Sequence, residues 1–448
     1  RAETILGRCY MSQKDYEKRQ TAIHMLRSGQ SPAEIAQELE RSLAWVYKWR
    51  LRFEQDGWQG LQDRSRAPHS HPHKLPDTVR QAIRQARSEL EMEAEQPGKL
   101  AYIGAQAVQS RLRQRQVEPL PGITSIERVL RAAGMTRPRQ SVQEPEIVYP
   151  HLHPGKPHQL TQVDIVTHFL PGGPCVACFN AIDVVSHYPD GQQYASRKSG
   201  DAANFLIRVW QQLGISQYTQ VDNESCFSGG FTHPGVLGKV LRLALYVGTE
   251  LIFSPIYHPK SNAYVERFHQ DYNQHVWGKL ELPDLASVQR HSPTFFEAFR
   301  GSEHITALRG LSPTQMHTAD PVLHLPTDFQ MPKKLPLTTG KVHFMRKVDQ
   351  EQKISLLNLT WDVPKAKPDQ GVWATLTFSN SGVRLSVYDA APDAPKRTCL
   401  ATYPFPLKEA VQPLNAAFQR PIAVRSSWIS LAAELFRLAI KVRISTML

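Results

Sequence analysis

Cysteine is scarce in this chain of 448 residues, which contains only five. An odd and low count provides no framework of paired cysteines, so a small secreted fold held by disulfides is excluded and reduced thiols are expected. Cys175 and Cys178 have the spacing of a metal or redox pair, but no second pair accompanies them. The residues around them have the pattern of a strand, and we therefore interpret these two thiols as a buried structural pair.

Long apolar runs are also missing. No segment reaches eighteen consecutive apolar residues, and no early segment has the form of a signal peptide. The nearest candidate, 428–440, is interrupted by Glu434 and Arg437, which favours an amphipathic helix or a non-native tail. These features argue against a membrane or secreted protein and predict a cytoplasmic one. Residues 411–448 have no recognisable partner in the sequence, and we leave this tail unassigned.

Basic residues outnumber acidic ones, with 53 Lys and Arg against 41 Asp and Glu and a formal net charge of +12. Such a surface suits a polyanionic partner, although charge alone does not separate a nucleic-acid-binding protein from a merely basic one. The length allows two to four domains. Hydrophobic residues make up 41% of the chain, so most of it is expected to fold.

Residues 14–68 have the pattern of a helix-turn-helix DNA-binding domain. Apolar residues recur at helical spacing, and residues 29–32 supply a helix stop, an N-cap serine and a first-turn proline. Residues 31–49 then predict a helix, a short turn and a second helix of the kind that enters the major groove. The alternative is a small helical packing module. The residues expected to meet bases or phosphates are Arg41, Ser42, Tyr47, Lys48 and Arg50.

Two linkers flank a second helical unit. The first linker contains His69, His71 and His73, which Pro72 interrupts, so we interpret them as solvated rather than as a metal site. Residues 76–135 resemble another helix-turn-helix domain, whose last helix carries Arg128 as a candidate DNA contact. Residues 136–158 contain five prolines and predict an extended linker.

From Gln159 onward the pattern changes to strands. Residues 160–169 alternate in polarity, residues 171–174 are turn formers, and residues 175–185 return as a second strand, which predicts a hairpin. An α/β core over 159–320 is therefore expected. Its further predicted elements are a third strand near 191–197, a helix over 201–213, strands at 218–223 and 251–255, and a helix over 261–277.

Three carboxylates stand out in this core by their placement. Asp164 lies inside the first strand, Asp222 at the end of a later strand, and Glu266 one turn into a helix. A carboxylate in a mostly apolar strand is costly unless it is paired or bound to a metal. Three oxygen ligands suit Mg²⁺, and two such ions activate a water or a DNA 3′-hydroxyl and stabilise the leaving oxygen. Each carboxylate taken alone is best explained by a structural role, but the three together in this order predict a metal site.

The residues around these carboxylates resemble the integrase-core (DDE) transposases of bacterial insertion sequences, which are related to retroviral integrases. The resemblance covers about 14–390, and its central motif is specific. The motifs that carry it are Gln162–Asp164, Val221–Asn223 with Phe227, Ser254–Pro255, Pro259–Phe268, Leu308–Pro313 and, near the N-terminus, Gly60–Arg66.

The resemblance implies a multidomain α+β protein with an RNase H-like catalytic core, a central mixed sheet covered by helices on both faces. It places a small β-barrel at 338–392. It also implies Mg²⁺ or Mn²⁺ as cofactor and cleavage and strand transfer at the ends of a mobile element as reaction. Element ends and target DNA would be the partners, a homo-oligomer on DNA the working form, and the bacterial nucleoid the location. Further candidate DNA contacts are Arg64, Arg66, Lys260 and Arg267, and the last two also fit exposed surface charges.

Two positions depart from the family pattern. Glu224 stands where glycine usually follows Asp-Asn, and Ala263 where glycine commonly follows Asn. We interpret Glu224 as a solvent-facing turn residue rather than a fourth ligand. The departures leave open a decayed or domesticated transposase that acts only as a sequence-specific DNA-binding protein. A nuclease of the same fold also stays open, although two DNA-reading units favour a site-specific recombinase.

Overall fold

The computed structural model describes residues 2–63, 75–96, 99–136, 149–229, 235–255 and 259–419, without the side chains of 2–14, 259 and 260. The chain divides into two compact units, 1–75 and 76–448. The three histidines of the first predicted linker, Arg64, Arg66, most of 136–158 and the end of the tail lie outside the described residues. No helix that the structure describes is both long and apolar enough to cross a membrane.

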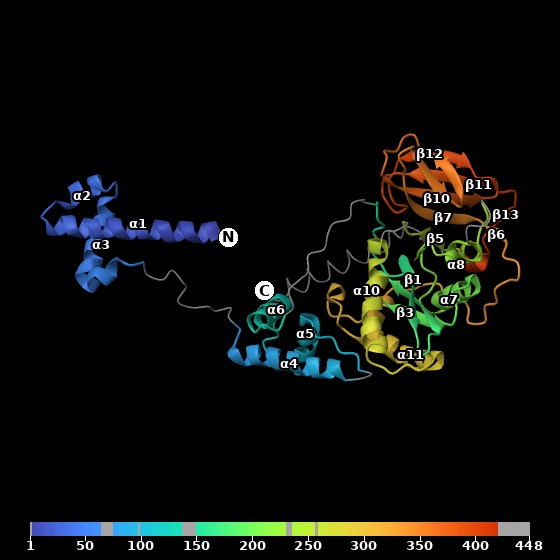
Figure 1. Ribbon diagram of the computed structural model, residues 1–448, viewed down its shortest axis with the longest axis horizontal. Helices are drawn as coiled ribbons and strands as arrows, with labels where there is room; N and C mark the ends of the chain where they lie inside the picture. Colours follow the sequence, from blue (N-terminus) through green and yellow to red (C-terminus); the bar gives the residue numbers. More distant parts are fainter. Residues whose placement is uncertain are drawn as a thin grey trace, which may run out of the picture. The chain divides into compact units, whose positions relative to one another are not determined.

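The first unit is a bundle of one long helix and three shorter ones around small clusters of buried residues. Ser31 is the N-cap of the second helix and Pro32 occupies its first turn, as the sequence predicts. Glu34 completes a capping box with Ser31. The elements are α1 (Ala2–Arg27), α2 (Pro32–Glu38), α3 (Leu43–Asp56) and the 3-10 helix η1 (Gly57–Leu61) (Figure 1). Buried Ile35, Val46 and Trp49 hold these helices together.

Gly60 lets η1 pack tightly on α3. A Cβ atom added at Gly60 would collide with the backbone carbonyl oxygen of Arg52, which cannot move without disturbing α3. The side chain of Arg19 fastens the same corner, because its guanidinium lies over the ring of Trp49 and donates to the carbonyl oxygen of Leu61 at 2.8 Å.

We therefore expect Gly60→Ala to destabilise the first unit by about 1–3 kcal/mol, the usual cost of overpacking. Hydrogen exchange of peptides from residues 15–63, measured in the full-length protein along a urea series, would report this loss. The neighbouring exposed Gln59 provides the control, since Gln59→Ala adds no atoms to the interface. Equal exchange in the two variants would contradict the packing argument.

The second unit begins with three helices, α4 (Asp77–Glu95), α5 (Ala105–Gln114) and α6 (Ile123–Ala132). Their buried faces carry aliphatic residues, and Arg111 on α5 is bridged to Glu93 on α4 at 2.7 Å. This helical part contacts the following α/β part at two places. Glu303 accepts a hydrogen bond from Arg113 at 2.9 Å, and the ring of Tyr102 stacks on that of His304 with 3.5 Å between ring centroids.

A nine-stranded sheet forms the centre of the second unit, in the order β12-β11-β10-β7-β5-β4-β1-β2-β3. The predicted hairpin is confirmed, because β1 pairs antiparallel with β2 from Thr161↔Asp183 to Phe169↔Cys175. The first five strands are β1 (Leu160–Phe169), β2 (Cys175–Asp183), β3 (Pro189–Tyr194), β4 (Tyr218–Val221) and β5 (Glu250–Phe253), and β1, β4 and β5 run parallel.

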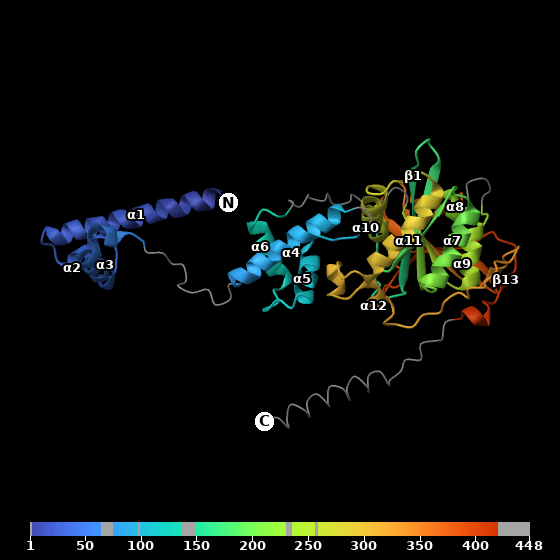
Figure 2. The ribbon, with the colours of Figure 1, turned by 90° about the horizontal axis from the view of Figure 1, so that it is seen from below.

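Helices cover both faces of this sheet, as the resemblance implies. One core lies under α7 (Ser199–Gln212) and α9 (Lys239–Val247), where Phe179 of β2 meets Phe205. On the opposite face lie α10 (Ala263–Tyr272) and α11 (Leu285–Gly301) (Figure 2). The core under these two helices contains Cys178 of β2 and Phe268. Neighbouring residues of β2 thus serve opposite faces, the alternation expected of a strand buried on both sides.

The interpretation of Cys175 and Cys178 as a buried pair is wrong for one member. Cys178 is buried in the core under α10, whereas Cys175 is exposed at the beginning of β2. An offset of three residues along a strand places two side chains on opposite faces, so these thiols cannot share one environment.

The prediction of a small closed β-barrel at 338–392 is also wrong. The strands β7 (Gly340–Lys347), β10 (Gly371–Ser379), β11 (Gly382–Tyr388) and β12 (Cys399–Pro404) extend the central sheet (Figure 1). β7 pairs in parallel with β5, and Phe344 stacks on Phe253 at 4.8 Å between ring centroids. Because β7 takes its partner from the edge of the core, the described strands form an open sheet. The remaining strands make two small pairs, β6 (Leu337–Thr338) with β13 (Val411–Gln412) and β8 (Lys353–Leu356) with β9 (Leu359–Asp362).

Burial of His304 makes the stability of the second unit dependent on pH. Burial lowers the pKa of His304 to about 3, and its Nδ1 has no hydrogen-bond partner in the structure. The folded state therefore favours the neutral ring, whereas an unfolded histidine titrates near 6.5. This contribution to stability is complete above pH 6.5 and is lost as the pH falls toward 3, by at most about 1.4 kcal/mol per pH unit.

We expect His304→Phe, which keeps the stacking on Tyr102, to flatten the fall in unfolding free energy between pH 6.5 and 4. Urea denaturation at several pH values would measure the slope. His324→Phe at an exposed histidine is the matched control. A slope unchanged by His304→Phe would contradict a neutral buried ring.

Candidate active site

Asp164 occupies the middle of β1, on the face covered by α10. Its cross-strand partner is the buried Asn180, and its side chain is 21% exposed. Burial raises the pKa of Asp164 to about 7, and the negative charges of Asp222, Glu266 and Glu224 add to this increase. The carboxylates of Asp222, Glu266 and Glu224 are therefore near enough to Asp164 to act on its carboxyl group.

Asp222 follows the end of β4 directly, and its Oδ1 accepts a hydrogen bond from the backbone N–H of Glu224 at 3.0 Å. Burial raises the pKa of Asp222 to about 6, the charge of Glu224 raises it further, and the charge of Arg197 opposes the increase. Glu266 lies in the first turn of α10, and burial raises its pKa as well. All three side chains thus hold protons more tightly than free carboxyl groups.

The ligand atoms of these three residues are not gathered within 4.8 Å of one another. Among the residues that the structure describes, the group that meets this criterion is His158, Asp183 and His317. The sequence placed no site there, and its hydrogen bonds argue for a structural role. Asp183 accepts from the backbone N–H groups of Ser186 at 2.7 Å and His158 at 2.7 Å.

The two histidines of this group differ in their hydrogen bonds, because His158 Nδ1 is buried without a hydrogen-bond partner. His158 Nε2 lies 3.0 Å from the carbonyl oxygen of His317 and must carry a proton there. His317 directs Nδ1 to Ser186 Oγ at 2.9 Å and Nε2 to the carbonyl oxygen of Leu213 at 3.1 Å. Both ring nitrogens of His317 therefore have protein partners, and the group fastens the end of β2 to α12 (Pro313–His317).

The donors around Asp164 suit a hard divalent cation. Three carboxylates offer oxygen ligands, which Mg²⁺ and Mn²⁺ prefer. The Cys226 thiol stays protonated, because burial raises its pKa to about 12 and the charges of Glu224 and Asp222 add to this increase. His269 Nδ1 lies 3.8 Å from Asp164 Oδ2, but burial lowers the pKa of His269 to about 4, so this contact is not a salt bridge at neutral pH. The side chains thus fit Mg²⁺ or Mn²⁺ in type, and metal binding would release protons from them.

Glu224 is not simply a solvent-facing residue. Its carboxylate is 3.2 Å from Arg197 in an ion pair, and its side chain is 32% exposed. Because its charge raises the pKa of both Asp164 and Asp222, it belongs to the electrostatics of the site. The sequence signal for this role was the departure from glycine at this position.

Asn223 connects the site to the C-terminal strands. Its amide donates to the carbonyl oxygen of Ser254 at 2.5 Å, and Arg346 of β7 donates to its Oδ1 at 3.1 Å. Burial lowers the pKa of Arg346 to about 10, so the guanidinium stays charged at neutral pH. Sequence reasoning assigned no role to Arg346, which brings a positive charge close to the end of β4.

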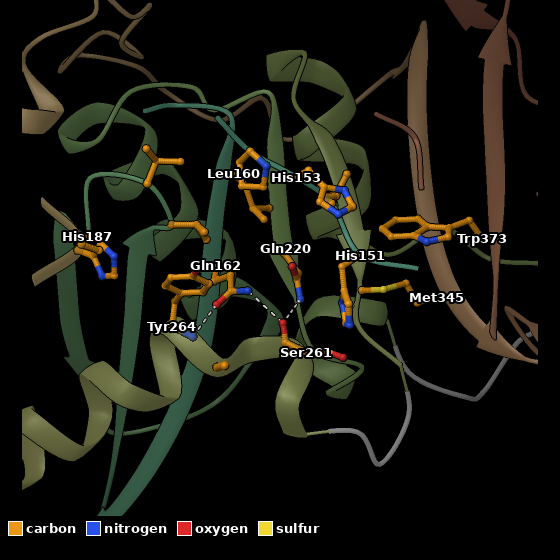
Figure 3. Close-up of a pocket in the computed structure, with 16 residues that line it drawn as sticks. His151, His153, Leu160, Gln162, His187, Gln220, Ser261, Tyr264, Met345 and Trp373 are labelled. Carbon is orange, nitrogen blue, oxygen red and sulfur yellow. Dashed lines mark hydrogen bonds between the residues drawn. The ribbon is translucent and has the colours of Figure 1, made fainter. Parts of the chain in front are cut away.

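Two buried glutamines that precede the aspartates were also given no role. Gln162 and Gln220 are register partners in the parallel pair of β1 and β4, and both contact Ser261 at the start of α10 (Figure 3). They form the floor of a cavity of about 620 Å³. Its other lining residues include His151, His153, His187, Tyr264, Met345 and Trp373, and none of the three carboxylates.

Four of the ten predicted DNA contacts have hydrogen-bond or ion-pair partners within the protein. Ser42 is the N-cap of α3 and accepts from Trp45, Arg41 is paired with Asp15, and Arg50 is paired with Glu54. Tyr47 and Lys48 are exposed on α3, and Arg128 is exposed on α6. Arg267 is paired with Asp271 at 3.2 Å but keeps a side chain 67% exposed. Lys260 belongs to the 3-10 helix η2 (Pro259–Asn262), and its side chain lies outside the described part, as do Arg64 and Arg66.

Comparison with known proteins gives one family match and several similar structures. Residues 19–81 match the family described as winged helix-turn helix. The simian T-cell lymphotropic virus intasome in complex with PP2A regulatory subunit B56 gamma is 16% identical with a TM-score of 0.31, over 68% of this chain and 95% of that one. The HTLV-2 integrase catalytic core domain in complex with magnesium is 13% identical with a TM-score of 0.28, over 37% of this chain and 99% of that one. The BIV integrase catalytic core domain is 17% identical with a TM-score of 0.28, over 36% of this chain and 94% of that one.

The ion pair of Glu224 with Arg197 predicts opposite pKa shifts at Asp222. We expect Glu224→Gln to lower the pKa of Asp222 by removing a negative charge, and Arg197→Gln to raise it by removing a positive one. Carboxyl-carbon NMR titration of selectively labelled, metal-free protein would measure both. Shifts of the same sign, or none, would show that the two charges do not act on Asp222.

Proposed function

We propose that the chain is a DNA-transesterifying enzyme of the integrase-core (DDE) type, a transposase of a bacterial insertion sequence. Asp164, Asp222 and Glu266 would be its catalytic carboxylates and would hold Mg²⁺ or Mn²⁺. Its reaction would be cleavage at the ends of a mobile element followed by strand transfer into target DNA. The RNase H-like topology of the resemblance is consistent with the order β3-β2-β1-β4-β5 of the first five strands.

One observation carries this proposal. Three carboxylates from β1, from the end of β4 and from α10 lie close enough for the charges of Asp222 and Glu266 to raise the pKa of Asp164. These side chains are partly buried. A partly buried cluster of like charges is destabilising, and such clusters are frequent at functional sites. A divalent cation among them would turn this repulsion into attraction.

The roles of the side chains follow from their positions. Asp164, Asp222 and Glu266 would bind and orient the ions, which activate the attacking hydroxyl and stabilise the leaving oxygen. Neutral His269 would contact Asp164 without competing for its charge. Arg197 and Arg346 would offset part of the negative charge that a phosphate meets at this edge of the sheet.

The helical N-terminal unit would read the element ends. The match to the winged helix-turn helix family over 19–81 supports a DNA-binding role for α3, where Tyr47 and Lys48 are exposed. Arg41, Arg50 and Arg267 would exchange their present ion pairs for phosphates, and Arg64, Arg66, Arg128 and Lys260 are further proposed phosphate contacts. A homo-oligomer assembled on DNA in the bacterial cytoplasm would be the working form.

A second candidate is a decayed or domesticated transposase that only binds DNA. Two observations favour it. The oxygens of the three carboxylates are not within 4.8 Å of one another as a group, and Glu224 adds a fourth negative charge beside Asp222. A nuclease of the same fold would share the carboxylates but would yield hydrolysed DNA without joined products.

We expect the purified protein with Mg²⁺ to join labelled DNA from the ends of its own genomic locus to a target. Glu266→Gln should reduce joining below detection, because an amide cannot replace the charge of the ligand. Asp222→Asn should abolish joining but leave DNA binding nearly unchanged, since it contacts no proposed DNA-reading residue. Loss of binding in step with joining would contradict a metal role. DNA binding without any product would favour the second candidate, and hydrolysis alone would favour a nuclease.

A further inference from the structure

We infer that Gln162 and Gln220 are positioning residues that set the placement of Glu266 relative to the two aspartates. This inference rests on the proposed function, because it concerns how the same site binds its metal. Both side chains are nearly inaccessible, with 4% and 3% exposed surface, and each lies two residues before an aspartate on a strand of the central sheet.

The register of the sheet places the two glutamines side by side. β1 and β4 run parallel, and Gln162 is the register partner of Gln220. Side chains two residues apart on a strand share a face, so Gln162 lies on the face of Asp164 within β1. The glutamine pair is thus one step along the sheet from the proposed metal ligands.

Both glutamines contact the same backbone carbonyl oxygen just before α10. Gln162 Nε2 donates to the carbonyl oxygen of Ser261 at 3.0 Å, and Gln220 Nε2 lies 2.9 Å from the same oxygen (Figure 3). Gln220 also contacts Asn262 Oδ1 at 2.7 Å, and Ser254 Oγ donates to that oxygen at 2.8 Å. Side chains of the sheet and of Ser254 therefore hold both the Ser261 carbonyl and the Asn262 side chain, which immediately precede α10.

Gln162 also supplies the cap of this helix. Asn262 precedes α10 as its N-cap residue but makes no side-chain capping bond. Instead, Gln162 Oε1 accepts from the backbone N–H groups of Tyr264 at 3.2 Å and Val265 at 3.4 Å. These are the second and third amides of the helix, which an N-cap side chain ordinarily serves. Glu266 is the next residue along the chain.

The chemistry of the amide explains why glutamine is suited to this position. A neutral amide has a donor for Ser261 and an acceptor for the helix amides, and the reversed orientation would set donor against donor at Tyr264. A carboxylate could not donate to the Ser261 carbonyl, and an apolar side chain would leave buried polar groups unpaired. The same contacts thus cap α10 and fix the distance between its first turn and β1.

The test uses Gln162→Met and Gln220→Met, which keep side-chain length but remove the hydrogen bonds. Gln193→Met on β3 is the matched control, because Gln193 lies on the same sheet and is only 3% exposed. Its Nε2 has no hydrogen-bond partner in the structure, and the side chain does not belong to the group that contacts the start of α10. We expect the Gln162 and Gln220 variants to raise the dissociation constant for Mn²⁺ at least tenfold, the usual effect of removing a group that orients a ligand. Gln193→Met should leave the constant unchanged.

Two further measurements separate positioning from general loss of fold. Hydrogen exchange of peptides covering 261–268 should accelerate in Gln162→Met, without metal, while peptides of α7 stay protected as in the control. In protein that already carries Glu266→Gln, Gln162→Met should have no further effect on the Mn²⁺ constant, because the group it positions is gone.

The outcomes distinguish this inference from the proposed function. If wild-type protein binds Mn²⁺ and joins DNA but the two glutamine variants match Gln193→Met, the positioning role is overturned and the proposed function stands. An additive effect of Gln162→Met in the Glu266→Gln background would also overturn it. Wild-type protein that neither binds Mn²⁺ nor joins DNA would overturn the proposed function itself, and the positioning role with it.

Discussion

The parallel pairing of β1 with β4 is the interaction on which the candidate site depends. Its register sets residues 58 positions apart side by side, and its last pair, Gln162 with Gln220, lies two residues before Asp164 and Asp222. Holding Asp164 there has a cost, because its pKa is raised from 3.8 to about 7. That difference corresponds to about 4 kcal/mol of folding free energy at neutral pH. The rest of the second unit must supply enough packing to offset it.

Packing on both faces of the sheet provides this offset. The strands alternate their side chains between the core under α7 and α9 and the core under α10 and α11. β7 then covers the edge of β5 and brings Arg346 to Asn223, next to Asp222. An uncovered β5 would leave unpaired backbone groups at the edge of the sheet. The C-terminal strands therefore protect the fold and also deliver a positive charge to the site.

The sequence was informative where local pattern and tertiary role agree. Alternation and turn residues predicted the β1–β2 hairpin, and charge within an apolar strand drew attention to Asp164. The sequence was uninformative where contact with a residue distant in the chain decides the local structure. The same alternation fits a closed barrel and an extension of the sheet, and only the pairing with β5 separates them. Gln162 has the pattern of an outward-facing polar residue, since nothing local shows that α10 will cover it.

The charges of the candidate site oppose those of the whole chain. The formal net charge of +12 attracts polyanions from a distance, and this attraction is not specific. At the candidate site, however, the four carboxylates of Asp164, Asp222, Glu224 and Glu266 outnumber the two guanidinium groups of Arg197 and Arg346. The local charge therefore repels a phosphate. A phosphodiester can approach such a surface closely only with cations between the two. The same carboxylates that would bind the metal would thus exclude DNA from the site until the metal is bound, which would couple DNA entry to metal binding in the proposed reaction.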